Sequence, residues 1–300
     1  MVVTLVSSRR DFLRRGAGLL ALGSAAGAGA LVARSGTGAN DPGAAANVLV
    51  AGSLQGVAGE IGDVSVEAHG SVACRRLLAD GLRDPDAVAL ADPGLFAGLS
   101  ERATCFATNA LVIAVAPDSP AADYAPDEAD DWRGLLADES LALGRTDPER
   151  DPLGYRTVMA LRLADDVDAE AVLARISVFP ETGLLRTLEA GGVDAAFAYR
   201  NMAVEHDLPY VDLPDAVDFS DPDRVDEYAR ASVALDDRTV TGAPVRYAAR
   251  GRTERGREWV RAVASARETL TGAGFGVPER YPVEREIPRN DGPQHSSSRQ

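Results

Sequence analysis

Two serines follow apolar segments that end in glycine, and at such a point a hydroxyl and unpaired backbone N–H groups can bind an anion. Ser53 comes after the run NVLVAG, and Ser71 comes after VSVEAHG and opens a helical pattern. A serine at a helix start caps the helix, and the N–H groups of the first turn have no partner within it. The helix dipole attracts anions to the same point. Each serine alone is compatible with an ordinary cap, but the pair in successive loops favours an anion site.

Two carboxylates and a tyrosine occupy similar positions further along the chain. Asp151 precedes a proline and a helical pattern, Glu181 follows the segment RISVFP, and Tyr199 ends the segment VDAAFAY. Asp-Pro is a common helix start and a first-turn glutamate is also common, so neither carboxylate alone identifies a site. All of these residues lie where a strand passes into the next element, which is where α/β proteins bind ligands.

The stretch HGSVACRR also raises the possibility of a cysteine nucleophile. Cys74, with His69 or His206 as its base, would suit a Cys-dependent hydrolase. No residue that would orient the base and no further oxyanion loop accompany this pair. A small residue that faces the sheet one turn into a helix explains Cys74 as well, so we expect no catalytic residue and no enzyme.

The chain has few cysteines and histidines that could bind a metal or form a disulfide. The cysteines are Cys74 and Cys105, and the only histidines are His69, His206 and His295. Structural zinc would therefore have to rely on carboxylates. One disulfide is possible, and the spacing does not tell whether it forms. We expect no resident cofactor.

The charge of the chain excludes some partners. It carries 46 acidic and 31 basic residues, a formal net charge of -15, and every basic residue is arginine. Such a balance argues against nucleic acid, whose phosphates require a basic face, and against anionic lipid. A dense carboxylate surface without lysine indicates a salt-adapted, halophilic protein. A GC-rich genome that favours arginine codons is the alternative explanation.

The first 34 residues are typical of a twin-arginine export signal. Arg9 and Arg10 stand before Phe12 and Leu13, and an uncharged run follows over residues 16–33. A membrane-spanning helix is the alternative, although 18 residues with five glycines would barely span and would be weakly helical. We expect an extracellular protein, which an uncleaved signal would tether to the outer face of the membrane.

The rest of the chain alternates short apolar runs with helical patterns, which predicts an α/β fold with mostly parallel sheets. Residues 35–46 are predicted to be a flexible linker and 284–300 a disordered tail. Two α/β lobes are expected between them, 47–116 with 245–283 as the first and 117–244 as the second. Proteins of this connectivity close about a hinge on a ligand that lies between the lobes.

Six segments in order, from about Val48 to Pro278, resemble the archaeal tungstate/molybdate-binding proteins of ABC importers: VLVAGSL, HGSVACRR, CFATNALVIA, RDPLGYR, LEAGGVDAAFAYRNMAVEH and LPYVDLP. The resemblance implies the periplasmic-binding-protein fold with one oxyanion in the cleft. It implies hydroxyl and nearby N–H donors from Ser53 and Ser71 and a donor from Tyr199. It also implies that Asp151 and Glu181 bond the molybdenum or tungsten, which then has six oxygen neighbours.

The two carboxylates carry the selectivity that the resemblance implies. A carboxylate that faces a dianion in a dry cleft repels it unless the ligand is protonated or the carboxylate bonds the metal. Sulfate cannot expand its coordination in this way, so the pair would discriminate against it. The sequence departs from the family at Ala198 and Gly183, where acidic residues are frequent, which weakens the assignment of Glu181 more than that of Asp151. The second lobe is also short between Asp166 and RISVFPE.

The function implied is capture of tungstate or molybdate outside the membrane by a monomer that delivers it to a permease and its ATPase. A binding protein for phosphate, sulfate or ferric ion is the alternative, because the fold alone does not separate these ligands. Tungstate and molybdate are nearly identical in size and charge, so the sequence does not distinguish between them.

Overall fold

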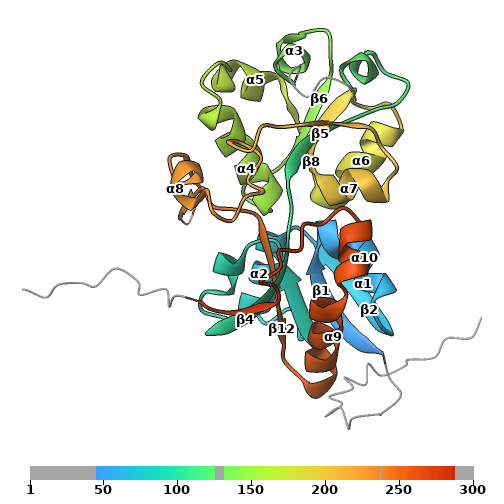
Figure 1. Ribbon diagram of the computed structural model, residues 1–300, viewed down its shortest axis with the longest axis vertical. Coiled ribbons are helices and arrows are strands. Elements are labelled where there is room, and N and C mark those ends of the chain that lie inside the picture. The colour runs from blue at the N-terminus through green and yellow to red at the C-terminus, as the bar shows by residue number, and fades with distance from the viewer. Residues whose placement is uncertain (1–44, 126–131, 237, 288–300) are drawn as a thin grey trace, which may run out of the picture. The chain divides into compact units, whose positions relative to one another are not determined.

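The computed structural model describes residues 45–125, 132–236 and 238–287, all within one compact unit that begins at Ala45 (Figure 1). The predicted export signal, residues 1–34, lies outside the described residues, as does all of the predicted linker but its last two residues. The last of these, Ala46, already belongs to the first strand. No helix in the described ranges is both long and apolar enough to span a membrane.

The first sheet has six strands in the order β13-β4-β12-β3-β1-β2. The runs at β1 and β3 are almost wholly apolar because both faces of these strands are buried, and β1 pairs in parallel with β2 and β3. Later segments join antiparallel, β12 between β3 and β4, and β13 at the edge beside β4. The strands are β1 (Ala46–Ala51), β2 (Val64–His69), β3 (Ala87–Leu90), β4 (Arg102–Thr108), β12 (Arg246–Gly251) and β13 (Val283–Glu286).

Helices cover this sheet, and α9 packs against β12, β1, β3 and β4 (Figure 1). Its apolar positions Trp259, Val260 and Val263 are buried, while the intervening charged residues are exposed. The helical elements of this part are η1 (Gly52–Leu54), α1 (Gln55–Glu60), α2 (Ser71–Ala79), η2 (Pro93–Phe96), α9 (Glu254–Ser265) and α10 (Arg267–Gly272).

The second sheet has five strands in the order β7-β6-β8-β5-β9. β6 pairs in parallel with β7 and β8, whereas β5 pairs antiparallel with β8 and β9. The strands are β5 (Leu111–Val115), β6 (Leu143–Thr146), β7 (Ser177–Phe179), β8 (Ala195–Tyr199) and β9 (Tyr210–Asp212), and a separate hairpin is formed by β10 (Ser232–Ala234) and β11 (Thr239–Thr241). The helical elements are η3 (Pro120–Tyr124), α3 (Trp132–Ala137), α4 (Pro152–Leu163), α5 (Ala169–Arg175), α6 (Glu181–Glu189), α7 (Arg200–Glu205) and α8 (Val225–Tyr228). The predicted α/β class is confirmed, but the sheets are mixed and not mostly parallel, because β12, β13, β5 and β9 pair antiparallel with their neighbours.

The strand predicted over TNALVIAVAP is shorter than expected and pairs in the other sheet. β4 ends at Thr108 in the first sheet, and β5 begins at Leu111 in the second. Between them the Asn109 side chain accepts the Ala110 N–H at 3.0 Å, which takes the place of a ladder bond. Residues 111–115 were expected in the first lobe, but their hydrogen bonds lie in the second sheet, because an apolar run carries no signal of its partner.

Part of the segment predicted to be a disordered tail is ordered, and the rest of it, residues 288–300, lies outside the described residues. Glu284, Arg285 and Glu286 continue β13 and pair with β4. All four residues of β13 are exposed, since it is the edge strand. A polar, charged edge strand has no apolar alternation, and it is therefore easily mistaken for a tail.

Candidate functional site

The five residues expected to bind a ligand all lie at strand ends. Ser53 lies in η1 directly after β1, and Ser71 is the first residue of α2 after β2. Asp151 caps α4 after β6, Glu181 opens α6 after β7, and Tyr199 ends β8. None is more than 5% exposed. A set of four polar or charged side chains and a tyrosine that is so deeply buried requires internal partners or a ligand.

Two glycines let the serine loops of the first sheet approach the carboxylate loops of the second. A Cβ on Gly52 would lie 2.8 Å from Glu181 Oε2. A Cβ on Gly70 would lie 2.6 Å from the Arg150 carbonyl oxygen and 2.8 Å from Asp151 Cβ. Only glycine permits the approach at Gly70, because its neighbour is a backbone atom, whereas at Gly52 a larger residue would have to displace the Glu181 carboxylate.

The serines do not cap their helices as expected. Gly70 is the N-cap of α2 and makes no side-chain cap, and η1 has none either. The Ser71 hydroxyl instead accepts the Ala91 N–H at 3.0 Å, at the end of β3. One N–H of the first turn of α2 is also engaged, since Ala73 N–H donates to the Arg150 carbonyl at 3.1 Å. The first turn of α2 therefore bonds the loop that precedes α4, and its other N–H groups remain as donors for a ligand.

Asp151 is buried but well satisfied. Its Oδ1 accepts the Thr146 hydroxyl at 2.7 Å and the Gly154 N–H at 2.9 Å, as an N-cap residue does. Burial nevertheless disfavours its charged form and raises its pKa to about 7.

Glu181 stands in sharp contrast, because neither of its carboxylate oxygens has a hydrogen-bond partner among the described residues. Burial, followed by the charge of Asp151, raises its pKa well above the usual range. The N–H groups of Gly52 and Ser53 and the Ser53 hydroxyl lie near enough to lower the pKa in part, although none completes a hydrogen bond. An unpartnered buried carboxylate of this kind is available to a ligand.

The Ser53 and Tyr199 hydroxyls are bonded to residues that the sequence did not single out. Ser53 Oγ and Tyr247 Oη lie 2.9 Å apart, and Asn109 Nδ2 donates to Tyr247 Oη at 3.3 Å. If Tyr247 accepts from Asn109, its own proton points to Ser53. Tyr199 Oη accepts from Arg156 Nη1 at 3.0 Å. Burial raises the pKa of both Tyr199 and Tyr247, so each hydroxyl keeps its proton.

An asparagine pair joins the same cluster from both sheets. Asn109 Nδ2 donates to Asn201 Oδ1 at 2.7 Å, and Asn201 Nδ2 donates to the Ser53 carbonyl at 2.7 Å. The sequence signals for these residues were weak. Arg156 lies five positions after Asp151 within RDPLGYR, whereas Asn109 and Tyr247 stand in ordinary apolar stretches.

The family of the chain follows from comparison with known proteins. The family model described as bacterial extracellular solute-binding protein matches residues 55–276. A Haloferax volcanii protein with the provisional name ABC transporter molybdenum-binding protein is 45% identical over 92% of this chain and 94% of its own. The chain belongs to the extracellular solute-binding protein family.

One further sequence relative and one solved structure resemble this solute-binding protein. The molybdate/tungstate-binding protein WtpA of Pyrococcus abyssi is 31% identical over 60% of this chain and 63% of its own. The solved structure of the Azotobacter vinelandii periplasmic molybdate-binding protein superimposes with a TM-score of 0.57 at 15% identity, over 78% of this chain and all of the other. This structural likeness concerns the fold alone, and it confirms the expected two-lobed α/β architecture. The sequence comparisons confirm a solute-binding protein and not an enzyme.

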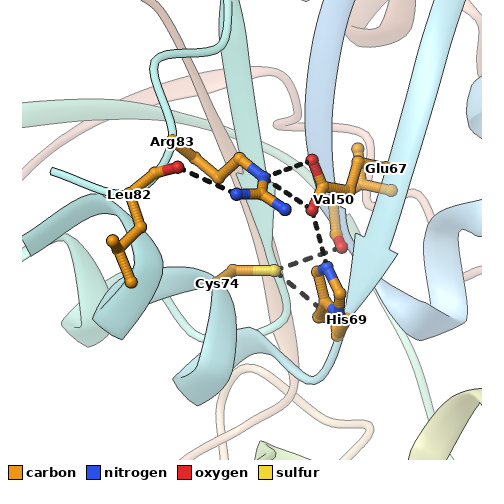
Figure 2. A network of polar contacts seen from close by, with 6 residues as sticks. All are labelled: Val50, Glu67, His69, Cys74, Leu82 and Arg83. Atoms are coloured by element: carbon orange, nitrogen blue, oxygen red, sulfur yellow. Dashed lines mark hydrogen bonds and ion pairs between the residues drawn. The ribbon is translucent and has the colours of Figure 1, made fainter. Parts of the chain in front are cut away.

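Cys74 has the environment of a packing residue in this solute-binding protein (Figure 2). Its thiol lies 3.3 Å from the Val50 carbonyl oxygen and 3.5 Å from that of His69. Burial raises its pKa to about 12, so almost no thiolate is present at neutral pH. The partners of the thiol are thus backbone carbonyls and not an imidazole, and the rings of His69 and His206 bond Glu67 at 2.8 Å and Glu189 at 2.6 Å. Cys74 and Cys105 are both free and form no disulfide.

A cavity of about 650 Å³ adjoins the cluster on one side. Gly52 and Glu181 line it, together with residues of α1, α6, α7 and α10, whereas Ser71, Asp151 and Tyr199 do not. Glu181 therefore stands between the buried cluster and a space large enough for a hydrated anion. No group of three or more His, Cys, Asp or Glu side chains within the described ranges is arranged to hold a metal ion.

Proposed function

We propose that this protein is the extracellular binding component of an ABC importer and that it captures tungstate or molybdate between its two sheets. The observation that carries the proposal is the meeting of Asp151 and Glu181 with the serine loops at Gly52 and Gly70. The names of the Haloferax and Pyrococcus relatives point to the same class of ligand.

The donor set suits a tetrahedral metal oxyanion. The hydroxyl oxygens of Ser71 and Tyr199 each accept from a protein donor, so their protons are left for the oxygens of the anion. The Ser53 proton is left in the same way when Tyr247 donates in the bond between the two hydroxyls. Hydrogen bonds from neutral donors stabilise a dianion without a full opposite charge beside it. Tyr199 contributes from the second sheet and the serines from the first, so the anion would join the two.

The carboxylates would discriminate among anions. Glu181 has two unpartnered oxygens, and Asp151 has one oxygen that is engaged by two donors. Molybdenum and tungsten can take both carboxylates as ligands, whereas sulfur and phosphorus cannot. Sulfate would therefore meet repulsion, and phosphate could relieve it only by donating a proton to one carboxylate, without any bond from the second carboxylate to a metal. Both metal oxyanions fit the same donors, and the protein itself needs no resident cofactor.

Delivery would follow capture. The protein would bind the anion outside the membrane as a monomer, close upon it and present the closed form to a permease that an ATPase drives. Closure is supported by bonds between the two sheets' loops, such as Asn201 Nδ2 to the Ser53 carbonyl and Ala73 N–H to the Arg150 carbonyl. These bonds can form only when the loops meet.

Calorimetric titration with tungstate, molybdate, sulfate, phosphate and ferric citrate tests the proposal. We expect dissociation constants of about 1 µM or lower for tungstate and molybdate, near -8 kcal/mol, and no detectable binding of the other three. Tight binding of phosphate, sulfate or iron without any of tungstate and molybdate would refute it.

A further inference from the structure

Arg156 is a buried arginine without an ion pair. It is 2% exposed, and no carboxylate lies within 4.0 Å of its guanidinium among the described residues. Its Nε has no hydrogen-bond partner. Burying a cation without a paired anion costs free energy of folding. Arg156 therefore lowers the stability of the protein in return for another role.

The guanidinium of Arg156 reaches both sheets. It extends from α4, and its Nη1 donates to Tyr199 Oη at the end of β8 in the second sheet, at 3.0 Å. The same Nη1 donates to the Ala91 carbonyl just after β3 in the first sheet, at 3.2 Å. Ala91 in turn donates its N–H to Ser71 Oγ at 3.0 Å. One side chain thus touches Tyr199 directly and Ser71 through a single residue.

The direction of these bonds follows from chemistry alone. A guanidinium has only donors, so the Tyr199 oxygen must accept from it. The Tyr199 proton then has to point elsewhere, and Ser71 is held in the same state by the Ala91 N–H. Arg156 therefore presets the Tyr199 hydroxyl as a donor before any anion arrives, and it holds the residue whose N–H does the same for Ser71, which lowers the cost of ordering these groups on binding.

We propose that Arg156 is a positioning residue of the oxyanion site, which holds the Tyr199 hydroxyl as a donor and ties the loop of Ala91 to the second sheet. This inference rests on the proposed function. The charge of Arg156 also opposes the accumulated negative charge of an anion beside two carboxylates. The bond to Ala91 spans the two sheets' loops, so its loss should chiefly speed the release of ligand, because it stabilises the closed form.

A double-mutant cycle with Tyr199 tests the positioning role. Arg156→Gln and Tyr199→Phe should each weaken tungstate binding by about tenfold or more, the usual effect of one hydrogen bond to a charged group. The double variant should be weaker than wild type by clearly less than the product of the two factors, because the arginine acts through the tyrosine. A purely structural arginine would give factors that multiply.

Arg156→Lys and a matched control complete the experiment. Lysine keeps the charge but is a point donor without the planar fork, so we expect intermediate affinity and a faster dissociation rate in stopped-flow measurements, with little change in association rate. Arg175→Gln is the control. Like Arg156, that arginine donates two hydrogen bonds, in its case to the carbonyls of Leu136 at 2.6 Å and Leu141 at 3.0 Å, but it lies on α5 away from the site. The Arg175→Gln variant should bind tungstate with the same affinity as wild type.

The results separate the inference from the proposed function. Wild type that binds neither tungstate nor molybdate refutes the function, whatever the variants do. Wild type that binds, with Arg156→Gln within twofold of it or with multiplicative factors, refutes the inference alone. Should Arg156→Gln fail to fold in a thermal melt, Arg156→Lys decides, since unchanged affinity and dissociation rate in that variant would equally overturn it.

Discussion

Asp151 and Glu181 are both buried carboxyl groups, but their surroundings give them different properties. Asp151 is held by Thr146 and Gly154, so its position is set by the start of α4. Glu181 makes no hydrogen bond among the described residues, and although the residue lines a cavity, its carboxylate oxygens are buried. At the scale of single residues, Asp151 is fixed by the fold, whereas the Glu181 carboxylate has no protein partner and remains available to a ligand.

Glu181→Gln should therefore separate binding from stability. The amide keeps the size of the side chain and replaces a buried carboxyl group that has no partner and is costly to ionise, so the ligand-free protein should be as stable as wild type or more stable. Tungstate affinity should fall by about 100-fold or more, near 3 kcal/mol, because an amide is a poor ligand for the metal. Tungsten X-ray absorption should show fewer than six oxygen neighbours. Glu189→Gln on the exposed side of the same helix should change none of these measurements.

The raised pKa of Asp151 predicts a pH dependence of stability without ligand. Its pKa is about 7 in the folded protein, against an ordinary value near 3.8 when unfolded. Between these values the folded state binds more protons, so this group's contribution to the free energy of unfolding falls as pH rises from about 4 to about 7. Asp151→Asn should remove that part of the slope.

Thermal melts of wild type and Asp151→Asn at pH 5 and pH 8, without tungstate, measure this difference. Asparagine still caps α4, so the comparison isolates the titration from the loss of the cap. Equal changes in melting temperature between the two pH values in both proteins would contradict the prediction.

At the scale of elements, the meeting of loops depends on close approaches at two glycines. Gly70, between β2 and α2, lies against the Arg150 carbonyl and Asp151, and Gly52, the first residue of η1, lies against the Glu181 carboxylate. The sheets position these loops, since the loops follow β1, β2, β6 and β7. Gly70 is thus a requirement of the closed arrangement, because its neighbour is backbone, whereas the Glu181 side chain could move away from a larger residue at position 52.

Gly70→Ala should impair closure more than folding. Its methyl group would overlap the Arg150 carbonyl, a backbone atom that cannot turn aside, so the loops would be held apart. We expect tungstate affinity to fall by about tenfold or more in calorimetry, near 1.4 kcal/mol, with a melting temperature close to wild type in the absence of ligand. Gly59→Ala in α1 has open space around the added methyl group and serves as the control. Wild-type affinity in Gly70→Ala would show that the loops do not need this contact.

At the scale of the whole molecule, the dominant feature is the excess of acidic residues. A formal net charge of -15 places like charges close together, and their repulsion destabilises the compact state. Ion pairs are present, but most join exposed side chains, such as Arg102 with Glu286 and Arg280 with Asp223, and each contributes little. The repulsion should therefore outweigh the pairs.

Salt should stabilise the protein for this reason. Raising NaCl from 0.2 M to 2 M shortens the Debye length from about 7 Å to about 2 Å, which screens the repulsion between surface carboxylates. We expect the melting temperature in calorimetric scans to rise by several degrees. A fall would mean that the ion pairs matter more than the net charge, and the salt-adapted interpretation of the composition would then be wrong.

Local sequence signals determined much of this protein. Apolar runs and helix starts predicted β1, β2, β3, α2, α4 and α6, and they placed Ser53, Ser71, Asp151, Glu181 and Tyr199 at strand ends, where the structure has them. These features are local, because a buried strand and a helix cap are each written in a few consecutive residues.

Tertiary structure alone decided which of these elements pair and which other side chains join the site. β5 hydrogen-bonds in the second sheet although its sequence continues from β4, and β13 pairs at an edge without any apolar pattern. Arg156, Tyr247 and Asn109 acquire their roles from partners between 43 and 194 positions away along the chain. Such contacts depend on where two sheets bring their loops together, and no short stretch of sequence encodes that meeting.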